Sequence, residues 1–183
     1  GPLILAGVAA QAAGWSVTIA MGGEYGSRVG ASFGSVGWGV GWLLFAGALL
    51  LVVRGRICGD RVSARLPLPA VAAGVCYVVA EAYWTVNLTD GGRGAEAIEQ
   101  YAMVVLLPAG ALLGSVGMIL TGIGVVRART WTGWHRWTPL LPGVFPFVGM
   151  FPVAVVAGAP MVASLIGWSL SWVPFGVAAL RAA

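Results

Sequence analysis

The sequence predicts an all-α protein: a bundle of six transmembrane helices that forms a single integral-membrane domain over residues 1–183. Composition is the first reason, because 59% of the residues are hydrophobic, only 9% are charged and the mean hydropathy is +0.92. Soluble domains carry about 25% charged residues. The second reason is a series of apolar runs, each close to the roughly 17–25 residues that a helix needs to cross a bilayer.

These apolar runs follow one another with short connections. None of them is built from the alternating segments of about ten residues that form the strands of a transmembrane β-barrel. Helices are therefore the expected secondary structure within the membrane. The six expected spans are Leu3–Met21, Phe33–Val53, Leu66–Leu88, Tyr101–Val126, Pro139–Ala157 and Pro160–Leu180.

The connections differ in charge, and the difference predicts the orientation. With six crossings, eight of the ten arginines fall on one side, against Arg28 and Arg93 on the other. Since basic residues in short loops are retained in the cytoplasm, we expect both termini to be cytoplasmic and the protein to lie in the cell (inner) membrane. This placement also explains the net charge of +4 without a nucleic-acid partner. The eight are Arg54, Arg56, Arg61, Arg65, Arg127, Arg129, Arg136 and Arg181.

Glycines recur at close spacing in two expected helices, Phe33–Val53 and Tyr101–Val126. Small residues four apart let helix backbones approach closely in lipid, where packing drives helix association. These helices are expected to be packing centres of the bundle, with a glycine-lined conduction path as the alternative. The glycines concerned are Gly37, Gly41, Gly110, Gly114 and Gly117.

Glu81 is the one acidic residue inside an expected span, Leu66–Leu88. An acidic side chain at the bilayer centre costs roughly 2.5–3.5 kcal/mol on insertion scales and less near the interface, so Glu81 is expected to face protein or water. Helical steps of three and four place Tyr77 and Trp84 on the same face. Tyr77 is the nearest expected partner, and desolvation favours a neutral, hydrogen-bonded carboxyl group.

The chain also repeats part of itself at a fixed offset of 73 residues. The matches join the second and third expected helices to the fourth and fifth, which predicts a parallel repeat. Biased composition is the other explanation for so short a match, and both stay open. Among the matched residues, Val52-Val53-Arg54 corresponds to Val125-Val126-Arg127, Arg56 to Arg129, and Leu68-Pro69 to Leu141-Pro142.

The expected span Pro139–Ala157 is the least regular, because each interior proline removes a backbone donor and crowds the preceding turn. We therefore expect a kinked or broken helix. It is either a kinked packing helix or a discontinuous helix that lines a ligand cavity. In the second case Pro146 and Pro152 border the same space as Glu81.

Trp131, Trp134 and Trp137 stand just before this span at a three-residue spacing. Indole rings favour the headgroup level, so the three are expected to anchor the protein at the interface. His135 lies among them and is the only histidine in the chain. A multi-histidine metal site and bis-histidine haem ligation are therefore excluded.

The sequence contains no catalytic, cofactor or metal signature. Cys58 and Cys76 are not spaced as a metal or redox motif and are expected to be unpaired. The preferred hypothesis is a membrane subunit or small permease-like transport protein that binds a small or lipid-like ligand through Glu81, Tyr77, Trp84, Pro146 and Pro152. Its partners would then be the bilayer, this ligand and another membrane protein.

Two other hypotheses remain open. The first is an intramembrane enzyme of the isomerase or cyclase type that acts on a lipophilic substrate, with Glu81 as general acid. The second is a purely structural subunit of a membrane complex. Neither hypothesis requires a cofactor or a metal ion.

The region Arg127–Arg181 resembles uncharacterised small multi-helix membrane proteins of high-GC Gram-positive bacteria. The resemblance rests on Val-Val-Arg-Ala-Arg at the end of a glycine-rich helix, a Trp-Arg-Trp interface and Pro-Leu-Leu-Pro-Gly. The absence of lysine and the abundance of Gly, Ala and Val also indicate a bacterial, GC-rich source. The resemblance implies a membrane compartment and carries no activity.

Overall fold

The computed structural model describes residues 1–21, 28–89, 105–150, 152 and 161–181, and within these ranges it contains helices and turns but no strand. The predicted all-α fold is thus confirmed. The long helices are α1 (Pro2–Ala20), α2 (Arg28–Arg54), α3 (Leu68–Thr89) and α5 (Leu107–Ala128). The shorter ones are α6 (Leu140–Phe145), continued by a π-helix (Pro146–Met150), α8 (Met161–Ser171) and α9 (Val173–Arg181), with short 3-10 helices at Ser63–Arg65 and Gly133–Trp137.

These elements agree with the six expected spans over the described residues, with ends shifted by a few residues; the parts of the last three spans at 101–104, 151 and 153–160 lie outside the described residues. Four helical stretches, one each for α1, α2, α3 and α5, are long and apolar enough to cross a membrane. The fifth span is represented by α6 with its π-helix, and the sixth by α8 and α9. The chain therefore has the fold of a polytopic helical membrane protein.

The two remaining spans are interrupted at prolines, as predicted for the fifth. Pro146 has no N–H to give to the carbonyl of Pro142, and the helix widens into the π-helix at this point. The indole Nε1 of Trp168 donates to that Pro142 carbonyl instead, at 2.9 Å. In lipid a freed carbonyl needs such a partner, so a side chain from α8 completes the broken helix. Likewise, Pro174 stands at the start of α9, where the sixth span divides.

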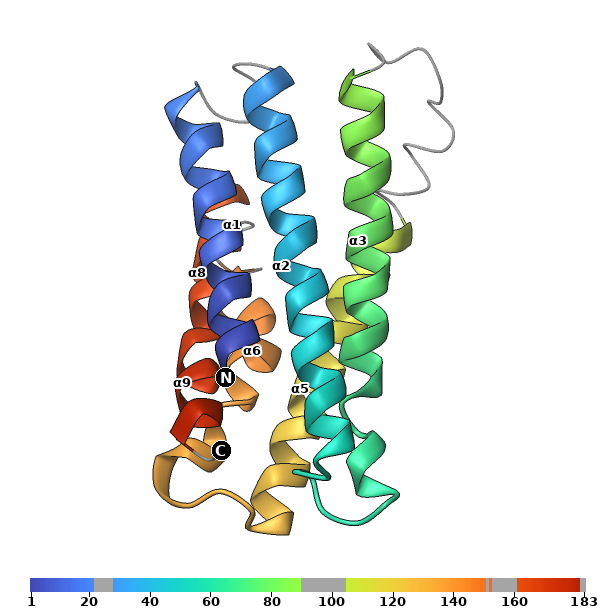
Figure 1. Cartoon of the computed structure of the whole chain (residues 1–183), viewed down its shortest axis with the longest axis vertical. Helices are drawn as coiled ribbons and strands as arrows, with labels where there is room; N and C mark the ends of the chain where they lie inside the picture. The colour runs from blue at the N-terminus through green and yellow to red at the C-terminus, as the bar shows by residue number, and fades with distance from the viewer. Residues whose placement is uncertain (22–27, 90–104, 151, 153–160, 182–183) are drawn as a thin grey trace.

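The helices are arranged as a closed ring. Each long helix packs against the next in the chain, α6 packs against α5 and α8, and α1 closes the ring against α8 and α9. Figure 1 shows α1, α2 and α3 side by side at the front, with α5, α6 and α8 behind them. In Figure 1, α1, α3 and α6 run upward along the chain, whereas α2, α5, α8 and α9 run downward.

Glycines set the closest helix contacts, as the sequence predicted. A Cβ placed on Gly37 would lie 2.8 Å from the Cα of Gly14, so α1 and α2 touch through their backbones. A Cβ on Gly117 would overlap the backbone nitrogen of Ala70 in α3, and one on Gly143 would lie 2.8 Å from the nitrogen of Ile119. Helices α2 and α5 are indeed packing centres.

Aromatic side chains fill the middle of the ring. Trp42 stacks on Tyr77 with ring centroids 4.4 Å apart, and Phe45 stacks on Trp172 at 4.2 Å. Edge-on contacts join Trp42 to Trp168 at 5.2 Å. Rings in such geometries attract beyond the area that they bury. The central aromatic cluster, as we name it, consists of Trp15, Trp38, Trp42, Phe45, Tyr77, Trp168, Trp172 and Phe175.

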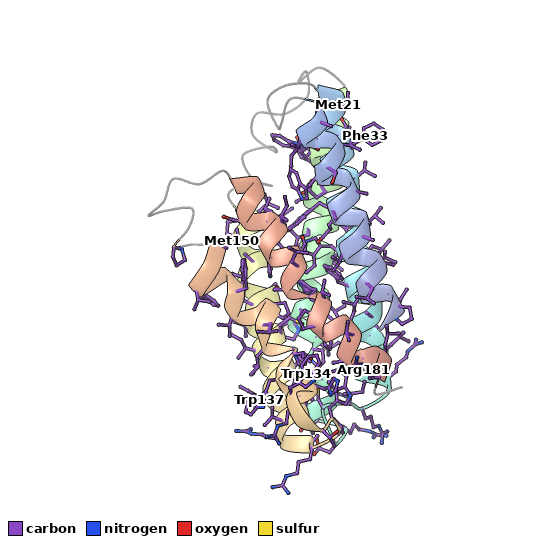
Figure 2. All side chains as sticks on the ribbon, turned by 90° about the vertical axis from the view of Figure 1, so that its left-hand side faces the viewer. Met21, Phe33, Trp134, Trp137, Met150 and Arg181 are labelled. Carbon is purple, nitrogen blue, oxygen red and sulfur yellow. The ribbon has the colours of Figure 1, made fainter. Side chains whose placement is uncertain are left out.

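The arginine-bearing segments lie at one end of the bundle. The connections that follow α2 and α5 are both at the lower end of Figure 1, and the marked N and C positions lie in the same half. In Figure 2, nitrogen-tipped side chains gather at this end, together with Trp134, Trp137 and Arg181, while Met21 and Phe33 lie at the other. The predicted separation of arginine between the two ends is therefore present among the described residues.

The tryptophans before α6 divide into two groups. Trp134 and Trp137 are 52% and 49% exposed, as an interfacial anchor requires. Trp131 is only 6% exposed and packs on Phe175 with centroids 5.8 Å apart. The expectation that all three are anchors was therefore wrong for Trp131, which closes the lower end of the aromatic interior.

The backbone follows the sequence repeat. Arg56 and Arg129, which correspond at the offset of 73 residues, are the two non-glycine residues with positive φ in the described chain, at 51° and 53°. A 3-10 helix follows each of them, and α3 and α6 then begin at Leu68 and Leu140, within one residue of the offset. Left-handed residues follow many helix ends, so this match alone does not decide between duplication and biased composition. A true duplication of the helix pair stays a prediction, with biased composition as the other explanation.

Candidate functional site

Glu81 of α3 faces α2. The hydroxyl of Ser35 donates to the carboxyl Oε2 of Glu81 at 2.5 Å and approaches the Glu81 backbone carbonyl at 3.1 Å. The hydroxyl of Thr85, one turn further along α3, donates to Ser35 Oγ at 2.9 Å. Gly39 keeps space for the carboxyl side chain, because a Cβ there would lie 3.4 Å from the Cβ of Glu81. The carboxyl group is half-buried.

The single hydroxyl hydrogen of Ser35 indicates which protonation state of the Glu81 carboxyl group fits the hydrogen bonds of this cluster. Ser35 has one hydroxyl hydrogen, so it cannot donate fully to both Glu81 oxygens while accepting from Thr85. A protonated Glu81 removes the conflict, because its own O–H then points to Ser35 Oγ. The Ser35 hydrogen is left for the backbone carbonyl, and Ser35 accepts from Glu81 and Thr85 with its two lone pairs. The geometry thus suits a neutral carboxyl group.

Tyr77 lies one turn from Glu81, as the helical spacing requires, but its ring belongs to the central aromatic cluster. It is buried between Trp42 of α2 and α5, where a Cβ on Gly110 would lie 3.0 Å from the Tyr77 ring. Glu81, Thr85 and Tyr77 therefore occupy the face of α3 turned towards α2. Their spacing was predictable, whereas the partner Ser35 was not.

The structure gives the burial of the other expected site residues. Trp84 is half-buried on α3. Pro146 is buried where α6 passes into the π-helix, and Pro152 is exposed. Helix α3 packs on α2 and α5, whereas α6 packs on α5 and α8. The structure brings Glu81 together with Ser35 and Thr85. That Pro146 and Pro152 border the same space stays a prediction.

A second set of polar groups lies buried in the interior, and the sequence did not single it out. Gln11, in the middle of α1, is 1% exposed, and among the residues that the structure describes neither its amide nitrogen nor its amide oxygen has a hydrogen-bond partner. The indole N–H groups of Trp15 and Trp42 and the hydroxyl of Ser164 have none either. In lipid such groups are costly unless something satisfies them. The signal was present in the sequence, because Gln11 is the one amide in its apolar run.

Two of these residues contact the ring of Trp38, and the other two stand one helical turn from residues that contact it. Trp15 and Trp42 both contact Trp38, with centroids 6.1 and 6.2 Å away. Gln11 stands one turn from Trp15 and presses against Gly41 of α2. Ser164 stands one turn from Trp168, whose ring lies 6.1 Å from that of Trp38. Together they offer several hydrogen-bond donors and few acceptors around an aromatic surface.

The described residues form no metal site, and the two cysteines are not paired with each other. Within the described ranges, no three His, Cys, Asp or Glu side chains gather as a metal site would require. Cys58 and Cys76 are both free, as expected. Burial raises the pKa of the Cys58 thiol to about 11, so at neutral pH it is a protonated, unreactive group within the connection after α2.

The fold and these clusters define a class, that of polytopic α-helical membrane proteins with an intramembrane carboxyl group and an aromatic interior. No protein-family model, curated protein or solved structure matches the chain. The assignment of a function therefore rests on the residues themselves.

Proposed function

We propose that this protein is a small permease-like membrane protein, or a membrane subunit, that binds a small or lipid-like ligand through the Glu81 cluster. The observation that carries the proposal is the position of the Glu81 carboxyl group, half-buried between α2 and α3 with Ser35 and Thr85 around it. Ionisable residues within membrane spans are rare and mark ligand or ion pathways. A half-buried carboxyl group remains within reach of a ligand, whereas a fully enclosed one does not.

The interior polar groups extend the proposal inward. Tyr77, one helical turn from Glu81, belongs to the central aromatic cluster. Beside this cluster, Gln11 and Trp15 have hydrogen-bond donors that are unpaired among the described residues. A ligand with one polar group and an apolar body would find hydrogen bonds at the carboxyl group and aromatic surface below it. This combination is typical of sites that take small amphiphilic molecules.

A structural role is the second candidate, because the Glu81 carboxyl group already has a partner on a neighbouring helix. In that case the cluster joins α2 to α3 and nothing more. The two functions differ in one respect: only the first needs a carboxyl group rather than an amide of the same shape.

The substitution Glu81→Gln distinguishes the ligand-binding function from the structural role. Its amide N–H can donate to Ser35 as the protonated carboxyl group does, so we expect the variant to fold with a thermal midpoint within a few degrees of the wild type. We expect it to lose the small molecule or lipid that co-purifies with the wild type, measured by native mass spectrometry. Equal retention by both proteins would support the structural role.

Ser35→Ala is the control for stability. It removes the shared donor and acceptor of the cluster and leaves Glu81 and Thr85 without it, so it should lower the free energy of unfolding by about 1–3 kcal/mol. A midpoint as high as that of the wild type would mean that the cluster does not hold α2 to α3.

We also propose that the protein resides in the cell membrane of a bacterium with both termini in the cytoplasm. The support is the separation of arginines between the two ends of the bundle. In a variant that lacks Cys58 and Cys76, a cysteine introduced at Arg61 or Arg129 should be shielded from an impermeant thiol reagent in intact cells. A cysteine at Arg93, which lies outside the described residues, should react. Labelling of position 61 from outside would contradict the proposed orientation and indicate the opposite one.

A further inference from the structure

The two arginine turns at the ends of α2 and α5 have an unusual backbone. After α2, the N–H of Ile57 donates to the carbonyl of Val52 at 3.3 Å and that of Arg56 to Val53 at 3.2 Å. This pair of bonds is a Schellman motif, whose left-handed position is most often glycine. Here the position is Arg56, with φ of 51°, and after α5 it is Arg129, with φ of 53°.

The helix dipole does not explain these two arginines. It favours a cation in the last helical turn, which accounts for Arg54 and Arg127. It gives no reason for a side chain with a Cβ at the following left-handed position, where glycine would avoid steric strain. The same strained choice occurs in both halves of the repeat. Strain kept at corresponding positions indicates a role for the side chains themselves.

The two turns lie against each other. Thr130 Oγ1 donates to the carbonyl of Ile57 at 2.6 Å, and these two residues also correspond at the offset of 73. A Cβ placed on Gly59 would lie 3.4 Å from the Cβ of Ala128. Arg56 and Arg129 each stand one residue from an end of the Thr130–Ile57 bond, and both side chains are exposed. The repeat thus places two equivalent arginines beside a single contact.

No ion pair joins these arginines to an acidic group in the part of the chain that the structure describes. Asp60, the acidic residue of the connection after α2, is hydrogen-bonded by the Ser63 side chain and by the Ser63 backbone N–H, the latter at 2.8 Å, and these two bonds lower the pKa of its carboxyl group. The exposed Arg54 and Arg127 flank the pair and add two further positive charges.

We propose that Arg56 and Arg129, with Arg54 and Arg127 beside them, bind the headgroup of an anionic phospholipid that carries two phosphates. The guanidinium group matches phosphate oxygens in two-pronged hydrogen bonds. Trp134 and Trp137, exposed at the same end of the bundle, place these turns at headgroup level. Two equivalent arginines at one contact suit two linked phosphates better than one, and basic pockets between transmembrane helices take such lipids. This inference does not depend on the role of Glu81.

The test compares lipids and variants in detergent. We expect diphosphatidylglycerol to raise the thermal midpoint of the wild type more than phosphatidylglycerol at equal phosphate concentration, and phosphatidylcholine to have no such effect. The double variant Arg56→Gln with Arg129→Gln should bind diphosphatidylglycerol at least tenfold more weakly. The matched control is Arg61→Gln with Arg181→Gln, which removes the same charge from the same end and should bind as the wild type does.

A second double variant, Arg56→Gly with Arg129→Gly, tests the strain. Because glycine adopts a positive φ without steric cost, this variant should melt above the wild type in the absence of anionic lipid and gain nothing from diphosphatidylglycerol. The inference is overturned if the control pair weakens binding as much as the Arg56 and Arg129 pair, which would indicate surface charge alone. It is also overturned if the wild type responds equally to the two anionic lipids.

Discussion

Gly117→Ala is expected to destabilise the bundle more than any other change of one methyl group. The added Cβ would overlap the backbone nitrogen of Ala70 and lie 2.7 Å from the Ala70 Cβ. Neither atom is the end of a flexible side chain, so α3 and α5 must move apart. Overpacking of this kind costs about 1–3 kcal/mol, and the separation would also loosen contacts elsewhere along the two helices.

Gly114→Ala is the matched control, three residues away on the same helix. Its Cβ would lie 3.4 Å from the Ala73 Cβ and 3.7 Å from Trp42, which is ordinary contact. This variant should unfold close to the wild type in thermal or denaturing-detergent titrations, while Gly117→Ala unfolds clearly earlier. Coincident curves for the two variants would show that α3 and α5 can adjust at Gly117.

Trp42→Ala should have the largest effect of any single truncation. Trp42 is fully buried and lies within 6.2 Å, centroid to centroid, of Phe45, Tyr77, Trp168, Trp172 and Trp38. Loss of a buried tryptophan side chain costs about 3–5 kcal/mol, because the lost contacts add to a cavity that the helices cannot fill. The measurement is the free energy of unfolding in mixed detergent.

The two substitutions Trp42→Phe and Trp168→Phe distinguish packing from hydrogen bonding. The indole N–H of Trp42 has no hydrogen-bond partner in the described ranges, so phenylalanine there should lose contact area alone. Trp168 donates to the carbonyl that Pro146 frees, so Trp168→Phe also leaves a buried acceptor unpaired, at a further cost of about 1–3 kcal/mol. If both variants lose the same stability, the bond between Trp168 and Pro142 does not support the broken helix.

The sequence predicted those features that depend on one helix at a time. Spans such as Leu3–Met21 follow from length and apolarity, and the break in the fifth span follows from its prolines. The shared face of Tyr77 and Glu81 follows from helical spacing. Each of these is fixed by the residues of a single segment.

Features that depend on which helices meet were not predictable. The sequence did not show that α2, rather than the proline-rich span, approaches Glu81, so Ser35 was missed. Nor could composition separate Trp131, which packs on Phe175, from the exposed Trp134 three residues later. Gly114 and Gly117 were equivalent by spacing, whereas only Gly117 touches the backbone of α3. The idea that Pro146 and Pro152 border the Glu81 site stays a prediction.

The closure of the ring by α1 against α8 and α9 bears on how the chain assembles during synthesis. Residues 21–160 separate α1 from the helices that complete its surroundings. During translation, α1 and α2 can pair early, but the side of α1 that meets α8 stays open to lipid until the last helices insert. Trp168 and Trp172 arrive with those helices, so Trp42 and Tyr77 obtain their final neighbours at the end. The hydrophobic centre of this protein is therefore the last part of it to form.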